Sequence, residues 1–330
     1  MQRVPDAGYR IIGLPIAGFD RKRLWKNVSV LIKLMRSQWK ARKVIKDFRP
    51  QVAVGVGGYA SGPTLKTAGM MGVPTLIQEQ NSYAGVTNKL LAQKAKVICV
   101  AYDGMEKFFP ADKIVMTGNP IRGIIVPATR EMKEAGVKEY GLDPSRKHIF
   151  VVGGSLGSSR FNQCMRKWIS DGCPGIDGVD VLWQCGKYYK KGVDEFMAEQ
   201  KARNPEVLRH VHHTDFVGRM ELAYAAADVV VSRSGASSVS ELCAAHKAVI
   251  FVPSPNVAED HQTHNAMALV RKDAALIVKD ADAMEKMIPT ALDLLKDEAR
   301  IAALEENAGK MALPDAAGKI AEEVYKLIKD

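Results

Sequence analysis

Short runs of β-branched and other apolar residues alternate with helix-forming segments along most of this 330-residue chain. Strands that alternate with helices build parallel sheets whose two faces are covered by helices. The sequence therefore predicts an α/β fold with doubly wound parallel sheets. The predicted strands are residues 10–14, 52–56, 75–78, 97–101, 114–117, 148–152, 179–184, 211–216, 229–232 and 249–252. The predicted helices are residues 24–46, 63–71, 84–93, 158–170, 193–201, 220–226, 238–246 and 263–272, with helices alone from Asp282 onward.

The alternation pauses once, at residues 118–130, and a second series of strands and helices begins at His148. A chain of this length is long enough for two domains of ordinary size. We predict an N-terminal domain of residues 1–122 and a C-terminal domain of residues 123–308. Residues 309–330, which end in an amphipathic helix, are predicted to pack back on the N-terminal domain.

The composition is that of a water-soluble protein, with 47% hydrophobic and 25% charged residues. No apolar run approaches the roughly 18 residues of a membrane-spanning helix. The first residues also lack the apolar region of a secretory signal, so we expect neither feature. The five cysteines are scattered without a Cys-x-x-Cys pair, which predicts reduced thiols rather than disulfides or a zinc site.

The most informative pattern lies in residues 227–266. A short β-branched strand ends at Ser232, a loop of small residues follows, and a helix then carries Glu241 in its first turns. Such a loop offers unpaired backbone N–H groups to an anion. A carboxylate one turn further along suits a sugar with adjacent hydroxyl groups. The combination predicts a site for a nucleotide sugar.

Two glycine-rich segments also follow predicted strands, at residues 153–157 and 57–58. Glycines let the backbone approach a phosphate closely, and a helix N-terminus attracts negative charge. Each segment alone fits a tight turn without a ligand equally well. Ligands of parallel sheets bind at the carboxyl ends of the strands, so two such sheets facing one another would form a cleft.

Polar side chains in three other loops each have two interpretations. Glu79, Gln80 and Asn81 follow a predicted strand, where they would either reach a ligand or cap the next helix. Arg122 would either bind a diphosphate across the cleft or lie on the surface as an ordinary arginine. Gln262 is interpreted as a hydrogen-bond partner of sugar hydroxyls.

His261 and His264, together with Asp260, have a spacing that suggests a metal site. We reject this interpretation because no further ligand pattern accompanies them. No metal site is predicted.

Residues 21–49 combine many cations with apolar residues that include Trp25 and Trp39, in a chain of net charge +10. The segment fits an ordinary covering helix with a solvated charged face. The two tryptophans also fit contact with an anionic membrane surface. A nucleic-acid partner is not predicted, since nothing else in the chain is typical of a nucleic-acid module. The cations are Arg21, Lys22, Arg23, Lys26, Lys33, Arg36, Lys40, Arg42, Lys43, Lys46 and Arg49.

Taken together, the motifs resemble one enzyme family. The chain is similar to the bacterial glycosyltransferases that add N-acetylglucosamine to undecaprenyl-pyrophosphoryl-N-acetylmuramyl-pentapeptide (lipid I) and so form lipid II. The matching stretches are GVGGYASGP, IQEQNSYAGVTNK, TGNPIR, VVGGSLGSSRFN, ADVVVSRSGASSVSE and DHQTHNA, in the family's order and over nearly the whole chain. The resemblance implies a GT-B architecture of two Rossmann-like domains, an inverting transfer from UDP-N-acetylglucosamine, and no metal cofactor.

The resemblance also implies roles for particular residues. Ser155, with Gly153 and Gly154 beside it, would approach the diphosphate, and Val217 would read uracil through its backbone. Gly235 and the turn that follows it would meet the phosphates, Glu241 would bind ribose, and Gln262, with His261 adjacent, would contact the sugar. Asn81 and Arg122 would contact the donor, while Gly57, Gly58 and Tyr59 would line the acceptor's pyrophosphate site. The residues expected in the turn after Gly235 are Ala236, Ser237, Ser238, Val239 and Ser240.

One feature of the family is missing from the printed sequence. Members begin with a strand that leads into a GGTGGH-type loop, whose histidine is the proposed general base. About 40 residues of the family pattern, the size of one βα unit, are therefore expected before this chain's first residue. The catalytic base is left unassigned, with Glu79 considered as a substitute. We expect a chain lacking that loop to bind UDP-sugar but to turn over poorly.

The resemblance further implies a peripheral protein on the cytoplasmic face of the bacterial inner membrane. Two alternatives stay open, because a fold and its donor loops do not fix the acceptor. One is a UDP-sugar transferase of the same fold that uses another lipid acceptor. The other is a donor-binding subunit that is inactive without a partner chain.

Overall fold

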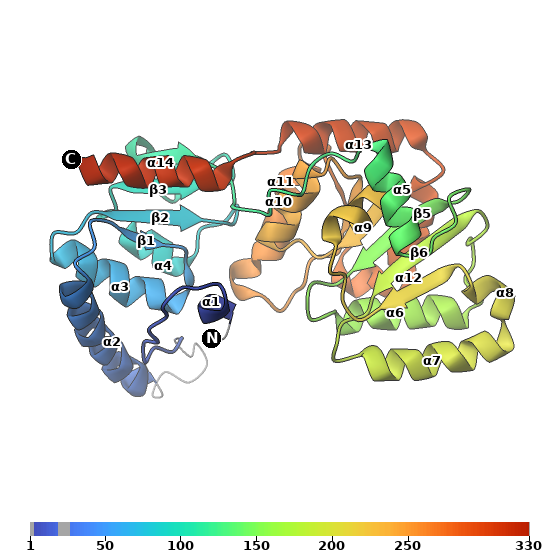
Figure 1. Cartoon of the computed structure of the whole chain (residues 1–330), viewed down its shortest axis with the longest axis horizontal. Coiled ribbons are helices and arrows are strands. Elements are labelled where there is room, and N and C mark those ends of the chain that lie inside the picture. The colour runs from blue at the N-terminus through green and yellow to red at the C-terminus, as the bar shows by residue number, and fades with distance from the viewer. Residues whose placement is uncertain (1–2, 19–26, 330) are drawn as a thin grey trace. The chain divides into compact units, whose positions relative to one another are not determined.

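The computed structural model describes residues 3–18 and 27–329 (Figure 1). These residues form two compact units: those within Met1–Gln80, Ala84–Thr117 and Gly318–Asp330 belong to the first, and those within Asn81–Tyr83 and Gly118–Ala317 belong to the second. The predicted strand–helix alternation and the α/β class are confirmed. The units divide at Thr117 and Gly118, whereas the domain division at residue 122 came from the sequence and stays a prediction.

The first unit is built on a four-stranded parallel sheet in the order β1-β2-β3-β4. Figure 1 shows α2 and α3 on one side of this sheet and α14 on the other. Its strands are β1 (Ala53–Gly55), β2 (Thr75–Glu79), β3 (Val97–Val100) and β4 (Ile114–Met116). Its helices are α1 (Arg3–Asp6), α2 (Asn27–Phe48), α3 (Gly58–Met70), α4 (Val86–Leu91) and α14 (Ala316–Lys329), of which α14 begins two residues inside the second unit.

The second unit is built on a six-stranded parallel sheet in the order β10-β9-β8-β5-β6-β7. Its strands are β5 (Lys147–Val152), β6 (Val179–Gln184), β7 (Val211–Thr214), β8 (Val229–Ser232), β9 (Val249–Phe251) and β10 (Leu276–Ile277). Its helices are α5 (Arg130–Glu139), α6 (Ser159–Ser170), α7 (Lys190–Arg203), α8 (Pro205–Leu208), α9 (Met220–Ala226), α10 (Ala236–Ala244), α11 (His261–Val270), α12 (Ala283–Leu294) and α13 (Glu298–Lys310). Because helices cover both faces of the sheet, strands β6 and β8 are buried along their whole length.

The strand order of the second unit contains one reversal. The chain winds outward from β5 through β6 to β7, then returns to β8 beside β5 and winds outward to β10 on the other side. In open parallel sheets, ligands bind outside the carboxyl ends of the strands at such a switch point. The loops after β5 and β8 are therefore the expected place for a ligand.

Two sequence predictions of secondary structure are wrong. Residues 10–14 form no strand: they have no regular structure, Ile11 and Ile12 are exposed, and Gly13 and Pro15 interrupt the apolar run. Helix α5 was not predicted, because the segment before it is rich in turn residues. The hydroxyl of Thr129 accepts a hydrogen bond from the N–H of Met132 and so caps this helix.

Asp180 is a buried carboxylate near the start of β6. It therefore lies at the amino-terminal ends of the strands, whereas the loops of the switch point lie at their carboxyl ends. Burial alone would raise its pKa, but the His212 imidazole, 3.6 Å from Oδ2, together with hydrogen bonds from the backbone N–H of Asp143 and from His210, outweighs burial and lowers the pKa. The distances are 2.8 Å from the Asp143 nitrogen to Oδ2 and 2.8 Å from His210 Nδ1 to Oδ1.

This lowered pKa predicts a pH-dependent contribution to stability. The contribution is fully present above the unfolded pKa of about 4 and is lost as the pH falls below it toward the folded value. Urea unfolding of Asp180→Asn should show a larger loss of stability at pH 7 than at pH 3. An equal loss at both pH values would contradict the assignment.

Candidate functional site

The glycine-rich loop after β5 lies at the switch point of the second unit. Its Gly157 has a φ of +79°, and a Cβ there would overlap the carbonyl oxygen of Cys185. A Cβ on Gly153 would lie 2.6 Å from the Cβ of Ser158. The loop is thus held against its neighbours where only glycine fits, while Ser155 is exposed at its tip.

Gln184, the last residue of β6, joins this loop to the segment that carries Val217. Its Nε2 donates to the carbonyl oxygen of Gly154 at 2.8 Å, and its Oε1 accepts from the N–H of Val217 at 3.0 Å. The side chain is buried. Since the Val217 N–H is already bonded, the carbonyl oxygen of Val217 is the backbone group that would accept a hydrogen bond from a nucleobase. Gln184 was missed because a glutamine at a strand end carries no distinctive sequence signal.

The loop after β8 leads directly into α10, whose N-cap residue is Gly235. No side chain caps this helix. The first backbone hydrogen bond of the helix runs from the N–H of Val239 to the carbonyl oxygen of Gly235. The N–H groups of the preceding residues, Ala236, Ser237 and Ser238, therefore lie ahead of the helical bonding pattern. Such N–H groups, with the positive end of the helix dipole, suit a diphosphate.

Glu241 lies farther along α10, and its side chain is 11% exposed. Arg122 makes a bidentate ion pair with it: Nε donates to Oε1 at 3.0 Å, and Nη2 donates to Oε1 at 2.9 Å and to Oε2 at 3.1 Å. The hydroxyl of Tyr224 donates to Oε2 at 3.4 Å, and burial raises the pKa of this tyrosine. Asn119 Nδ2 donates to Ser240 Oγ at 3.0 Å. The TGNPIR segment thus packs on α10, and Arg122 orients Glu241.

Arg233 connects the loop after β8 to the loop after β5. Its Nη1 donates to Asp280 Oδ1 at 2.7 Å and to the carbonyl oxygen of Val252 at 2.8 Å, while Nη2 donates to Ser158 Oγ at 2.9 Å. The guanidinium carbon lies 4.8 Å from the centre of the Phe161 ring. The sequence did not single out this arginine, although a charged residue in a loop of small residues was a usable signal.

Gln262 lies in the first turn of α11, beside the loop after β8. Its carbonyl oxygen accepts from Ser234 Oγ at 2.8 Å, and its side-chain Oε1 accepts from the N–H of Ser254 at 2.8 Å. The Nε2 end of the amide is therefore the end that can donate to a sugar hydroxyl. His261 precedes it, with its ring centre 6.4 Å from that of Tyr83.

Asn81 also belongs to the second unit, as part of the Asn81–Tyr83 segment, whose flanking residues Gln80 and Ala84 belong to the first. Its Oδ1 accepts from Asn265 Nδ2 at 3.0 Å. The second unit therefore brings together all of the predicted donor-binding residues. They come from the 81–83 segment, the Arg122 segment, the loops after β5, β7 and β8, and helices α10 and α11.

The predicted acceptor residues lie in the first unit, at the start of α3. Gly57 and Gly58 have φ values of +83° and +74°, and Tyr59 is 64% exposed. Gln80 Nε2 donates to the carbonyl oxygen of Val56 at 3.0 Å and so holds the start of this loop.

Glu79 is buried at the end of β2 in the first unit. Its Oε2 accepts from the N–H of Gly85 at 3.0 Å and from Asn88 Nδ2 at 2.8 Å. The geometry fits the capping of α4, the alternative that the sequence had left open.

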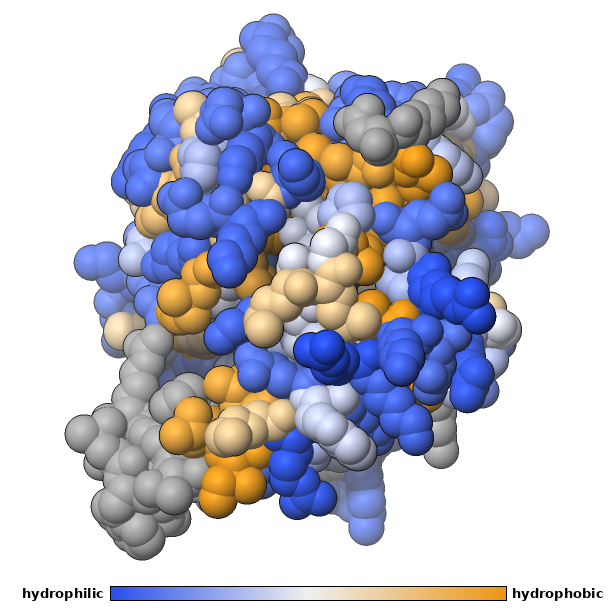
Figure 2. All heavy atoms as spheres, turned by 90° about the vertical axis from the view of Figure 1, so that its left-hand side faces the viewer, coloured by the Kyte–Doolittle hydropathy of each residue, from blue (hydrophilic) through white to orange (hydrophobic). Residues whose placement is uncertain are grey.

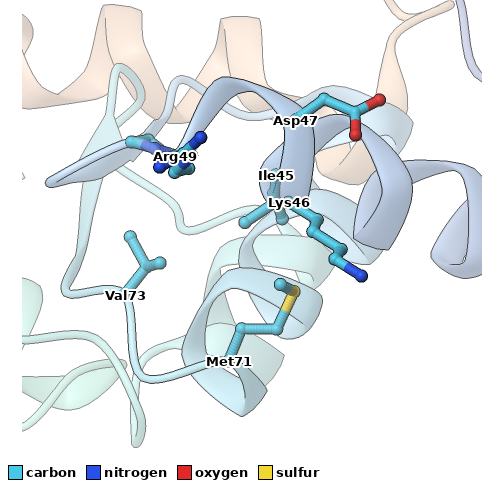
Figure 3. A pocket seen from close by; sticks show the side chains of 7 residues that line it. Ile45, Lys46, Asp47, Arg49, Met71 and Val73 are labelled. Atoms are coloured by element: carbon cyan, nitrogen blue, oxygen red, sulfur yellow. The ribbon is translucent and has the colours of Figure 1, made fainter.

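A hollow of about 770 Å³ lies near the amino-terminal ends of β1 and β2, beside the residues that precede these strands (Figure 3). None of the predicted site residues lines it. Its lining residues are Ile45, Lys46, Asp47, Arg49, Pro50, Met71 and Val73.

The described residues include no group of three or more histidine, cysteine, aspartate or glutamate side chains that could hold a metal ion. All five cysteines are buried without disulfides. Burial raises the pKa of Cys99 to about 11 and that of Cys243 to about 12, which keeps these thiols protonated and unreactive.

Comparison with known proteins agrees with these features. Residues 148–320 match the glycosyltransferase family 28 C-terminal domain, and residues 1–100 match its N-terminal domain. The UDP-N-acetylglucosamine--N-acetylmuramyl-(pentapeptide) pyrophosphoryl-undecaprenol N-acetylglucosamine transferase of Bacteroides thetaiotaomicron is 62% identical over 99% of this chain and 86% of its own length. The protein of that name from Porphyromonas gingivalis is 47% identical over 100% of this chain and 85% of its own length.

Solved structures give the same picture. The crystal structure of Acinetobacter baumannii MurG has a TM-score of 0.75 and 25% identity, covering 98% of this chain and 87% of that one. A UDP-GlcNAc 2-epimerase from Neisseria meningitidis, bound to UDP-GlcNAc, shares the fold with a TM-score of 0.62 and 13% identity, over 89% of this chain and 81% of that one. The chain belongs to glycosyltransferase family 28 and, within it, to the family of UDP-N-acetylglucosamine--N-acetylmuramyl-(pentapeptide) pyrophosphoryl-undecaprenol N-acetylglucosamine transferases.

Proposed function

We propose that this chain transfers N-acetylglucosamine from UDP-N-acetylglucosamine to the 4-hydroxyl of the N-acetylmuramyl-pentapeptide of lipid I, forming lipid II for peptidoglycan synthesis. The observation that carries the proposal is the donor site at the switch point of the second unit, in a chain 62% identical to a transferase of that name. The hydroxyl oxygen attacks the anomeric carbon, the bond to the UDP oxygen breaks, and the configuration inverts. The hydroxyl proton leaves to a base.

The donor half of this reaction is assigned to residues of the second unit. The N–H groups at the start of α10 and the loop that carries Ser155 stabilise the negative charge that grows on UDP. Glu241 accepts hydrogen bonds from the ribose hydroxyls, and Gln262 Nε2 donates to the sugar. These groups carry the leaving-group charge without a metal ion, so transfer should persist in EDTA. No residue is assigned as the base, because Glu79 is engaged in capping α4.

An assay with purified chain, UDP-N-acetylglucosamine and lipid I tests the proposal. The expected result is a lipid product that contains one added N-acetylglucosamine and an equal amount of released UDP, formed slowly where the GGTGGH-type loop is absent and faster where it is present. Diacylglycerol as the acceptor is expected to give no product; transfer to it instead would favour the alternative lipid acceptor. Binding of UDP-N-acetylglucosamine with no transfer to either lipid would favour a donor-binding subunit that needs a partner.

We further propose that α2 docks the first unit on the anionic cytoplasmic surface of the inner membrane. Leu31, Met35 and Trp39 recur at a spacing of four residues, and their exposed fractions are 54%, 64% and 74%. Exposed cations flank them, and Figure 2 shows apolar atoms among hydrophilic ones on this side of the molecule. Among the described residues, no helix is long and apolar enough to cross a membrane. Part of the predicted segment, residues 21–26, lies outside the described residues.

The double variant Met35→Glu/Trp39→Glu should bind phosphatidylglycerol vesicles at least about tenfold more weakly, because it removes apolar area that would otherwise be buried in the lipid. Vesicle co-sedimentation measures the effect. Tyr188→Glu, which alters an 81% exposed ring in the second unit, is the matched control and should bind as the original chain does. Equal binding of both variants would exclude α2 as the docking element.

A further inference from the structure

Asn265, on α11, is a completely buried side chain that bonds to two separate loops of the second unit. Its Nδ2 donates to Asn81 Oδ1 at 3.0 Å and to the carbonyl oxygen of Ser234 at 3.2 Å. Its Oδ1 accepts from the N–H of Ser82 at 2.9 Å. Both donors and one acceptor of the amide are therefore used.

The two loops joined in this way carry different groups of the donor site. Ser234 immediately precedes Gly235 and the N–H groups that lie ahead of the helical bonding pattern of α10, and Asn81 is a proposed donor ligand. The ring of Tyr83 stacks on His264 with 4.7 Å between the ring centres and 17° between their planes. Adjacent residues of α11 thus hold the backbone and the ring of the same short segment.

We propose that Asn265 is a positioning residue. It fixes the position of Asn81 relative to the loop before α10, so that both can contact the donor sugar nucleotide. The inference rests on the proposed function for its assignment of the donor. An amide is required here because only an amide both donates twice and accepts at one position. Leucine could fill the space without bonding, and aspartate could accept from Ser82 but not donate to Asn81 or Ser234.

Asn265→Asp tests the role with the smallest change of shape. Asn162→Asp is the matched control, since Asn162 is also buried, its Nδ2 donates to the carbonyl oxygen of Cys185 at 2.9 Å, and its Oδ1 accepts from Trp183 Nε1 at 3.1 Å. Both variants should lose comparable stability in urea unfolding. Only Asn265→Asp should raise the donor KM at least tenfold, with the acceptor KM unchanged.

Two further measurements separate positioning from general damage. Asn81→Ala should weaken UDP-N-acetylglucosamine binding, but much less so when Asn265→Ala is already present, because both changes disrupt one connection. The Ser82 amide should exchange its hydrogen faster in Asn265→Ala than in Asn162→Ala. Additive losses, an unchanged Ser82 exchange rate, or equal donor KM values for the two aspartate variants would overturn the proposal.

The exchange and calorimetric binding measurements need no turnover. If the original chain transfers no sugar, the proposed function fails, but the exchange and binding measurements still decide whether Asn265 has the positioning role. If the original chain is active and Asn265→Asp keeps its donor KM, the positioning role alone fails.

Discussion

Glu241→Ala is expected to weaken UDP-N-acetylglucosamine binding by about 100-fold. The variant removes both carboxylate oxygens that would accept the ribose hydroxyls, and hydrogen bonds to a charged group contribute about 1.5–3 kcal/mol each. It also leaves the Arg122 guanidinium and the buried Tyr224 hydroxyl without their shared partner. Isothermal titration calorimetry with UDP-N-acetylglucosamine and with UDP measures the loss.

The preference for UDP over 2′-deoxy-UDP tests the role of Glu241 at the ribose more specifically than a loss of affinity does. The original chain should bind UDP more tightly than 2′-deoxy-UDP, and Glu241→Ala should bind the two equally. Asp228→Ala is the matched control. The side chain of Asp228 is 16% exposed and ion-paired with Lys133, but it directly precedes β8 and so lies at the amino-terminal end of that strand, away from the loop that follows it. This control should lose stability and keep the preference for UDP. A preference that survives in Glu241→Ala would remove Glu241 from the ribose site.

Arg122→Ala should lower affinity in the same direction, because Arg122 orients the Glu241 carboxylate. The losses of the two single variants should not add in the double variant. Full additivity would instead indicate that Arg122 acts on the donor independently, as the sequence had suggested through the diphosphate.

Gly157→Ala is expected to cost about 3 kcal/mol of stability and to abolish measurable donor binding. The new Cβ would overlap the carbonyl oxygen of Cys185 and lie 2.8 Å from the Cα of Gly186, so backbone has to move. Overpacking of this kind costs about 1–3 kcal/mol, and the left-handed φ adds about 1–2 kcal/mol. The displaced loop carries Ser155 and the Gly154 carbonyl to which Gln184 is bonded.

Gly141→Ala separates steric overlap from backbone strain. Gly141 has a φ of +65°, and no atom lies within 4 Å of its added Cβ. This control should cost only about 1–2 kcal/mol in urea unfolding and bind the donor normally. If the two variants lose equal stability, the close approach of the loops after β5 and β6 does not constrain Gly157.

The local pattern predicted the parts of the fold that depend on adjacent residues. The β-branched run before Ser232 and the small residues after it identified the α10 loop, since a strand end, a tight loop and a helix start are encoded consecutively. Residues 10–14 failed because a strand exists only with a pairing partner, which the residues themselves do not encode. The side chains of Gln184, Arg233 and Asn265 were missed for a related reason: each bonds to a loop distant in sequence, and only the folded sheet brings these loops together.

The placement of residues 81–83 has a practical consequence for dissecting this protein. The chain passes between the units four times, so neither unit corresponds to one continuous stretch of the gene. A fragment spanning residues 118–317 would lack Asn81 and Ser82 and would leave the Asn265 amide with only Ser234 as its partner. Recombinant study of the nucleotide-binding half therefore calls for a linked design that restores the 81–83 tripeptide, rather than truncation at a single boundary.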